Sequence, residues 1–353
     1  GNKTLQVAAA GSTGSVTVDT KSWVYGTTNG SVLDYQATTF TENNLASGKI
    51  TFKVDEKALR NTLEGYNFAE QVLADAKNVD LSRELTNEVA VGLTSYLNKV
   101  EAAATDAGVA AADIPALVDR EAEAFLDEAD LATNMAGAAG AFTTALDIND
   151  QVTAAIDRRN SIANVNVVRG DVGVTPWVDV FGTTNEAKRL YGEGAGYEAD
   201  IYGAVLGFDY TASCGGTLGL AFNVGTADAN SKGISPEVTN DVDFYGVSLY
   251  AAKQFGALNV KADFGYIATE NDLKLNAQRL SHNFSEKLDG DVLTFGVGAE
   301  YLVNAGAFNV VPHAGIRVTN LGIDDSKYGA DYDDMTVYQM PLGVAFSGTF
   351  ETN

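Results

Sequence analysis

The stretch LTFGVGAEYLV, residues 293–303, carries the pattern that decides the fold. Every second residue is apolar, and the residues between them are small or polar. The apolar row is Leu293, Phe295, Val297, Ala299, Tyr301 and Val303, and the other row is Thr294, Gly296, Gly298 and Glu300. A period of two places the rows on opposite faces of a β-strand. The stretch therefore predicts a strand with one apolar face and one small or polar face.

The same alternation recurs throughout residues 165–353, which hold most of the glycines and aromatic residues of the chain. It appears in residues 202–210, 218–224, 243–251, 258–268, 308–318 and 338–350. Together with a strand that starts near Trp177, these stretches predict eight strands. Strands of about ten residues with one apolar face are typical of a transmembrane β-barrel. A soluble β-sandwich also alternates, so the pattern alone leaves both folds open.

Charged residues in mid-strand favour the barrel. Five candidate pore-lining residues occupy the row opposite the apolar one, namely Lys261, Asp263, Glu300, His313 and Arg317. Glycines are their neighbours in the same row, as a wet lumen would allow, although a sandwich can also expose a polar face. His313 is interpreted as a polar lining residue in preference to a ligand.

The connections favour the barrel more strongly. We expect long loops at 183–199, 226–241, 269–290 and 320–334, and short turns at 213–216, 255–257 and 304–307. Long loops at one end and tight turns at the other are the rule for outer-membrane barrels. The expected fold is a transmembrane antiparallel up-and-down β-barrel.

Composition excludes several other classes of protein. The 353 residues include 23 Lys and Arg against 47 Asp and Glu, a net charge of -24, which argues against nucleic-acid binding. One cysteine and two histidines provide no disulfide framework and little for metal binding. No nucleophile, base and orienting group can be assembled, so we expect no enzyme, no cofactor and no metal. The carboxylates of the loop near 324–334 miss the calcium-loop spacing and are interpreted as solvated.

Two further segments precede the barrel. Residues 1–54 contain short β-patterns separated by Gly and Asn turns, which suit either the end of a β-solenoid or a small β-meander. Residues 55–164 have apolar positions at helical spacing and predict about four helices, with breaks near 79–80, 108–113 and 137–140. Asp113 is a plausible N-cap, with Pro115 in the first turn.

The last helix, near 141–164, is only weakly amphipathic and is polar nearly all round. We expect it to need water or a polar tube, with Asp157, Arg158 and Arg159 pairing with the luminal charges. An eight-stranded lumen is filled by side chains and leaves no room for a helix. We therefore expect about twelve strands in the whole barrel and a C-terminally truncated chain. The start at Gly1, without a leader, suggests a fragment or a processed form.

The order of these segments resembles a bacterial autotransporter, a type V secretion protein. The resemblance lies in an ordered series: Arg158-Arg159, then 177–182 (WVDVFG), 194–200 (GAGYEAD), 203–210 (GAVLGFDY), 218–222 (LGLAF) and 245–250 (YGVSLY).

The resemblance implies a barrel of twelve strands, C-terminally truncated here at 165–353, with a helix threaded through it. It implies an outer-membrane translocator that exports or displays its own passenger at the cell surface, with residues 1–54 as the passenger's end and 55–164 as a linker containing the pore helix. Outer-membrane lipid, the barrel-assembly machinery and periplasmic chaperones are the implied partners of a monomeric barrel. The alternative is an adhesive surface protein whose barrel is only an anchor.

Overall fold

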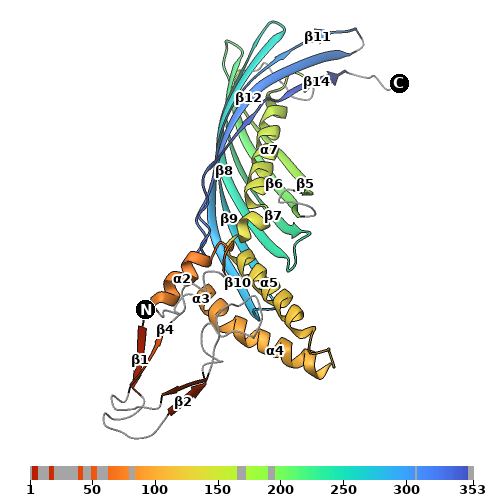
Figure 1. The fold of residues 1–353 in the computed structure, drawn as a ribbon. Coiled ribbons are helices and arrows are strands. Elements are labelled where there is room, and N and C mark those ends of the chain that lie inside the picture. Colours follow the sequence, from red (N-terminus) through yellow and green to blue (C-terminus); the bar gives the residue numbers. More distant parts are fainter. Residues whose placement is uncertain are drawn as a thin grey trace. The chain divides into compact units, whose positions relative to one another are not determined.

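The computed structural model describes residues 2–6, 16–19, 39–42, 49–53, 63–78, 84–164, 172–189, 195–306 and 308–348. The chain divides into two compact units (Figure 1). The first unit comprises residues 1–135, 275–284 and 326–330. The second unit comprises residues 136–274, 285–325 and 331–353, and it contains most of the sheet.

A ten-stranded antiparallel sheet forms a curled half-barrel. Its strands are β5 (Gly173–Ala187), β6 (Gly196–Thr211), β7 (Gly216–Lys232), β8 (Val238–Phe255), β9 (Leu258–Ala277), β10 (His282–Tyr301), β11 (Val303–Asn304), β12 (Asn309–Ile323), β13 (Met335–Gln339) and β14 (Leu342–Ser347). Consecutive strands lie side by side, which confirms the antiparallel up-and-down order.

The ten segments make eight strand positions. β11 continues β10 along β12 in the same register, since Glu300 of β10 lies opposite His313 and Val303 of β11 lies opposite Val310. β13 and β14 likewise share one register along β12 and are separated only around Pro341, which has no N–H to donate. The expectation of eight strands in this part of the chain is met, and twelve for the whole barrel stays a prediction.

Several strands run much further than the sequence pattern predicted. The expected loop at 269–290 is mostly strand, because β9 continues to Ala277 and β10 begins at His282. The expected loop at 226–241 shrinks in the same way to the residues between Lys232 and Val238. The prediction was wrong here because the apolar residues change from one face of the strand to the other, which interrupts the alternation in the sequence.

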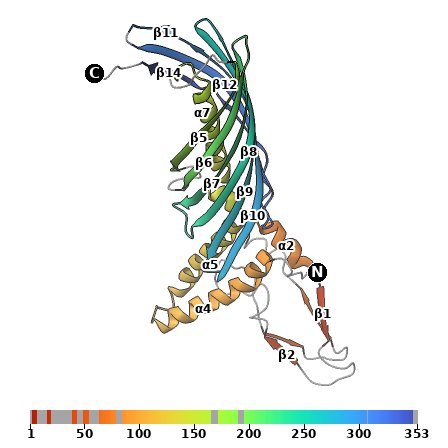
Figure 2. The ribbon, with the colours of Figure 1, turned by 180° about the vertical axis from the view of Figure 1, so that it is seen from behind.

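Helix α7 (Ala141–Asn160) lies along the concave side of this sheet (Figures 1 and 2). Its apolar face carries the buried Ile148, Val152 and Ile156, which belong to one hydrophobic cluster with inward-facing side chains of the strands. Several strand members of the cluster are alanines, namely Ala199, Ala221, Ala227 and Ala229. Small side chains leave room for the helix inside the curve.

This packing corrects the expectation of a polar tube. Arg158 is the single exposed residue of α7, and over much of its length the helix meets apolar groups in place of water. The weak amphipathicity was misleading because five of the ten buried residues of α7 are Ala or Thr, whose hydropathy differs little from that of polar residues. No helix that the structure describes has the length and apolar character that crossing a bilayer requires.

The first unit is mainly helical. Its helices are α2 (Ala69–Asn78), α3 (Glu84–Asn87), the π-helix η1 (Glu88–Gly92), α4 (Leu93–Asp106) and α5 (Ile114–Thr133), and α6 (Met135–Ala138) follows them. α5 begins after Asp113 with Pro115 in its first turn, as predicted, although the Asp113 side chain makes no capping hydrogen bond. Leu97, Val118, Phe125 and Leu126 are among its buried core residues.

The turn between β9 and β10 belongs to this unit and is held by carboxylates of α5. Arg279 Nη1 lies 2.6 Å from Oε1 of Glu128, and the backbone N–H of Arg279 donates to Glu128 Oε2 at 2.9 Å. Arg279 Nε donates to Glu121 Oε2 at 3.3 Å, and the Tyr96 hydroxyl donates to the same oxygen at 2.6 Å. These hydrogen bonds, led by that of Tyr96, hold the pKa of Glu121 below its ordinary value.

A pH-dependent contribution to stability follows from the lowered pKa of Glu121. A carboxyl group with a lowered folded-state pKa stabilises fully above its ordinary pKa of 4.5 and loses that contribution as pH falls through the lowered value. Glu121→Gln is therefore expected to lower the melting temperature of the helical circular-dichroism signal at pH 7, and to have little effect at about pH 3. Glu123→Gln, on the same helix but exposed, is the control. Equal effects of Glu121→Gln at both pH values would contradict the assignment.

The described part of residues 1–54 contains two antiparallel pairs. β1 (Asn2–Gln6) pairs with β4 (Lys49–Lys53), and β2 (Val16–Asp19) pairs with β3 (Thr39–Glu42). Most of residues 1–54 lie outside the described residues, so both the solenoid end and the meander stay predictions.

Candidate functional site

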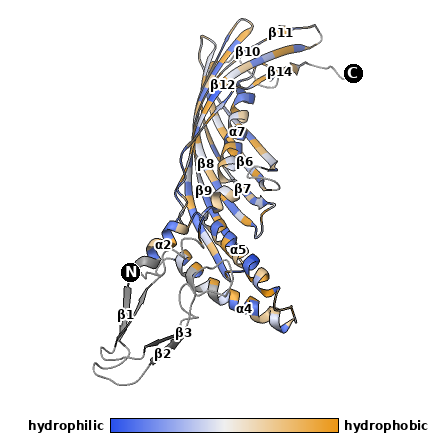
Figure 3. Ribbon diagram, viewed as in Figure 1, coloured by the Kyte–Doolittle hydropathy of each residue, from blue (hydrophilic) through white to orange (hydrophobic). Residues whose placement is uncertain are grey.

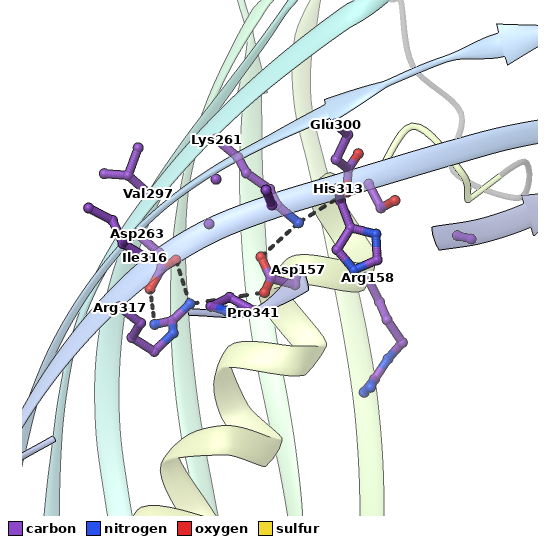
Figure 4. A pocket seen from close by; sticks show the side chains of 15 residues that line it. Asp157, Arg158, Lys261, Asp263, Val297, Glu300, His313, Ile316, Arg317 and Pro341 are labelled. Atoms are coloured by element: carbon purple, nitrogen blue, oxygen red, sulfur yellow. Dashed lines mark hydrogen bonds and ion pairs between the residues drawn. The ribbon is translucent and has the colours of Figure 1, made fainter. Parts of the chain in front are cut away.

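The C-terminal end of α7 meets a cluster of charged side chains on the inner face of the sheet (Figure 4). Lys261 Nζ of β9 lies 2.9 Å from Asp157 Oδ1 of the helix and 3.1 Å from Glu300 Oε1 of β10. One ammonium group therefore bridges the helix to two neighbouring strands. The Lys261 side chain is largely buried, so its charge is balanced by these two carboxylates.

A second ion pair adjoins the first. Arg317 of β12 binds Asp263 of β9 through two parallel contacts, Nη1 to Oδ2 at 2.6 Å and Nη2 to Oδ1 at 2.9 Å. Both side chains are only 9% exposed. Arg317 Nη2 also lies 4.0 Å from Asp157 Oδ2, so Asp157 stands between the two basic groups. A two-pronged arginine–carboxylate pair fixes geometry as well as charge.

A cavity of about 220 Å³ lies beside these ion pairs. Asp157, Lys261, Glu300, His313 and Arg317 are among the residues that line it, and Figure 4 shows their side chains converging around it. The His313 ring stands over Gly343 of β14, where a Cβ atom would lie 2.6 Å from Nε2. This polar cavity lies at the C-terminal end of α7.

The final turn of α7 is tied to the sheet through backbone groups. The Asn259 side-chain amide donates to the carbonyl oxygen of Asn160 at 3.0 Å and to Glu300 Oε2 at 3.3 Å. The backbone N–H of Ile162 donates to that Glu300 oxygen at 2.8 Å. The last carbonyls of a helix lack partners within the helix, so Asn259 supplies one for Asn160.

The two arginines of α7 find partners on the first two strands. Arg158 forms an ion pair with Asp179 of β5 at 3.1 Å, and half of its side chain is exposed. Arg159 Nε donates to Asp209 Oδ2 of β6 at 2.5 Å in a mostly buried setting.

Asp209 has two further partners within the lumen. Trp177 Nε1 donates to Asp209 Oδ1 at 3.1 Å and to the Tyr250 hydroxyl at 2.6 Å, and that hydroxyl donates to Asp209. The Tyr250 ring lies directly on Gly219, where a Cβ atom would come within 2.0 Å of its Cζ. The glycine therefore makes the position of Tyr250, and with it the setting of Asp209, possible.

The other end of α7 is also held. The Tyr197 hydroxyl of β6 donates to Asp147 Oδ2 at 2.7 Å, and Gln339 Nε2 of β13 donates to both Asp150 oxygens at 3.2 Å. Gly140, at the start of the helix, has a φ of +70° and lies against the Tyr197 ring. The helix is thus attached to the sheet along its whole length.

The structure brings together most of the residues singled out from the sequence. Asp157, Lys261, Asp263, Glu300 and Arg317 form one network, and His313 lies on the wall of the same cavity. Arg158 and Arg159 face other carboxylates than those expected.

The sequence analysis missed Asp179, Asp209, Asn259 and the Trp177–Tyr250 contact. Asp209 and Asn259 lie in the rows opposite Tyr210 and Val260, so the alternation could have identified both as luminal. Within the described residues, no group of three or more His, Cys, Asp or Glu side chains is arranged to hold a metal ion.

The comparison with protein families matches the autotransporter beta-domain over residues 176–353, which is half of the chain. The chain belongs to the autotransporter family. The matched region coincides with the curled sheet, and membership places the beta-domain in the outer membrane as a monomeric barrel of the type V secretion system. A search among curated proteins found no match.

Proposed function

We propose that this autotransporter beta-domain anchors the chain in the outer membrane, displays the segment before it at the cell surface, and retains α7 in the lumen as a plug. The observation that carries the plug is the attachment of α7 at both ends. Tyr197 holds Asp147 near the start of the helix, and Lys261 and Asn259 hold its end.

The plug combines two kinds of contact. Around Ile148, Val152 and Ile156 the contacts are apolar and exclude water. Around Asp157 they are ion pairs beside a cavity, where contacts with solvent reduce their contribution to stability. We assign the seal to the apolar part and the positioning of the helix to the ion pairs. This differs from the water-filled lumen expected from the sequence.

The orientation follows from the connections between strands. The β6–β7 and β8–β9 connections, residues 212–215 and 256–257, are tight turns, as is typical of the periplasmic side of outer-membrane barrels. α7 ends near that side, because β5 starts opposite Thr211 of β6. The segment before α7 then lies on the cell-surface side. We include the barrel-assembly machinery and periplasmic chaperones as partners on the basis of the family.

Protease treatment of intact cells tests display and orientation. One epitope is inserted at Gly108, in the exposed turn between α4 and α5, and a second at Gly215, in the exposed β6–β7 turn. External protease is expected to remove the Gly108 epitope and leave the Gly215 epitope, and both should disappear once the outer membrane is opened. Protection of the Gly108 epitope on intact cells would contradict surface display.

A display function restricted to adhesion, with the barrel as a mere anchor, would pass the same protease test. Recovery of residues 1–54 in the medium would indicate a released passenger, whereas a displayed adhesin stays with the cells.

A further inference from the structure

The outward face of the long strands changes from apolar to polar at a sharp point. On β9 the exposed side chains from Leu258 to Tyr266 include Val260 and Phe264, whereas Glu270 and Lys274 occupy the same face further along. The strand itself is continuous over its 20 residues. Figure 3 shows the alternation of apolar and polar residues along the strands.

The same change occurs on neighbouring strands. The last large apolar residues on the outward face are Tyr202, Tyr245, Tyr266, Leu293, Val318 and Tyr338. The first polar outward residues beyond them, towards the cell-surface side, are Asp200, Asp243, Glu270, Asp291, Asn320 and Thr336.

Strand pairing connects these positions, in register on some strand pairs and with a step of two residues on others, where Tyr202 lies opposite Thr226 and Leu293 opposite Asn320. Val318 lies opposite Tyr338, and Asn320 lies opposite Thr336. Val224 lies opposite Tyr245 in the same way, with Thr226 opposite Asp243 one step further on. The boundary therefore runs from strand to strand, as the edge of a surrounding layer would.

The inward face changes in the opposite sense. Below the boundary β9 turns Asn259, Lys261 and Asp263 inward. Above it the inward row contains no charge: Ile267, Leu273 and Leu275 are buried there, together with the uncharged Thr269 and Asn271. A strand segment with apolar residues inside and charges outside has the polarity of a water-soluble protein. The two halves of one strand are therefore built for different solvents.

The cost of burying charge in lipid argues against lipid around the strand segments beyond this boundary. A charged side chain on the lipid-facing side of a barrel strand is destabilising, and increasingly so towards the centre of the bilayer. Asp243, Glu270, Asp289 and Asp291 would all carry such a cost if lipid reached them. Tyrosines, by contrast, favour the membrane–water interface, where Tyr202, Tyr245 and Tyr266 would lie.

The geometry points to a lipid boundary at the row of Tyr202, Tyr245 and Tyr266, with the remaining strand segments projecting from the outer leaflet into water. Residues 258–266 of β9 and 293–301 of β10 then span the bilayer, close to the 9–11 residues that a tilted transmembrane strand needs. This inference rests on the outer-membrane localisation, and only the side of projection rests on the proposed orientation.

The apolar seal around α7 then lies mostly outside the bilayer. Its strand members Ile201, Val242, Ile267 and Val292 are all on the upper side of the boundary. The ion pairs of Asp157, Lys261 and Arg317 lie at bilayer depth, where the outward face of the strands is apolar and the inward face is polar. The seal therefore belongs to the projecting part.

Single cysteines on either side of the boundary test its position in the full chain. Cys214→Ser removes the exposed native thiol, and Phe264→Cys and Glu270→Cys then flank the boundary on β9. Val297→Cys and Lys287→Cys form the matched pair on β10. Each thiol receives a small fluorophore, and the refolded protein is placed in vesicles of ordinary or acyl-chain-brominated phospholipid. Each variant is checked for folding by a change in its gel migration between unheated and heated samples.

Bromine quenches only fluorophores in contact with the acyl chains. Brominated lipid is expected to reduce fluorescence about twofold or more at positions 264 and 297, and to leave positions 270 and 287 nearly unchanged. Similar quenching at all four positions, or at none, would overturn the boundary. Vesicles have no cell-surface side, so this result is independent of orientation.

A membrane-impermeant maleimide applied to intact cells tests the proposed orientation separately from the position of the lipid boundary. Labelling at 270 and 287 but not at 264 and 297 supports projection at the cell surface. If quenching places the boundary correctly but 270 and 287 are labelled only after the membrane is opened, the boundary stands and the proposed orientation fails.

Discussion

Ile148→Asp is expected to unseat α7 and to open the lumen to ions. Ile148 is fully buried in the apolar cluster that joins the helix to the strands. A carboxylate there loses the packing of the isoleucine and must be desolvated, at a combined cost of about 4 kcal/mol or more. Because each 1.4 kcal/mol is a factor of ten, the population of the unseated state is expected to rise by about a thousandfold.

Planar-bilayer conductance measures this effect. The unaltered protein is expected to be closed for almost all of the recording, and Ile148→Asp to show frequent, long openings. Gln151→Glu is the control, because it adds a negative charge to the same helix at a half-buried position outside the apolar cluster.

An internal deletion of residues 141–160 is a second route to the open state. The deletion shortens the connection to the first strand and so pulls the residues before 141 towards the lumen, where they could close the pore themselves. Ile148→Asp is therefore the more decisive variant. If both variants keep the conductance of the unaltered protein, α7 is not what closes the pore.

Arg317→Ala is expected to destabilise the barrel by about 3 kcal/mol. The substitution leaves Asp263 buried and without its two-pronged partner, and a buried charge with no counter-ion is far more costly than a missing pair. The neighbouring cavity admits solvent, which places the effect at the lower end of the usual range. Urea unfolding of the protein in vesicles, followed by tryptophan fluorescence, gives the difference in free energy.

Two comparisons sharpen this test. Adding Asp263→Asn to Arg317→Ala removes the stranded charge and is expected to restore most of the loss, which a double-mutant cycle converts into a coupling energy. Arg158→Ala removes a half-exposed arginine from the same lumen and is expected to cost less than about 1 kcal/mol. Equal losses for Arg317→Ala and Arg158→Ala would show that burial does not govern these pairs.

The sequence by itself determined the barrel and its location. Alternation is a local property of consecutive residues, so Leu293, Phe295 and Val297 reveal an outward apolar face without any knowledge of neighbouring strands. The same alternation placed Lys261, Asp263, Glu300 and Arg317 on the opposite face and so identified them as candidates for the lumen. The order of helix and strands then led to the family that the comparison shows.

Only the tertiary structure decided how far the strands run and what α7 contacts. At Tyr266 and Ile267 the apolar row of β9 moves to the other face, and a one-dimensional pattern cannot distinguish this reversal from the start of a polar loop. The partners of Arg158 and Arg159 depend on the rotation of α7 inside the sheet. That rotation is set by the packing of Ile148 and Val152 against residues distant in sequence, because burial and ion pairing are properties of the assembled interior and not of any single segment.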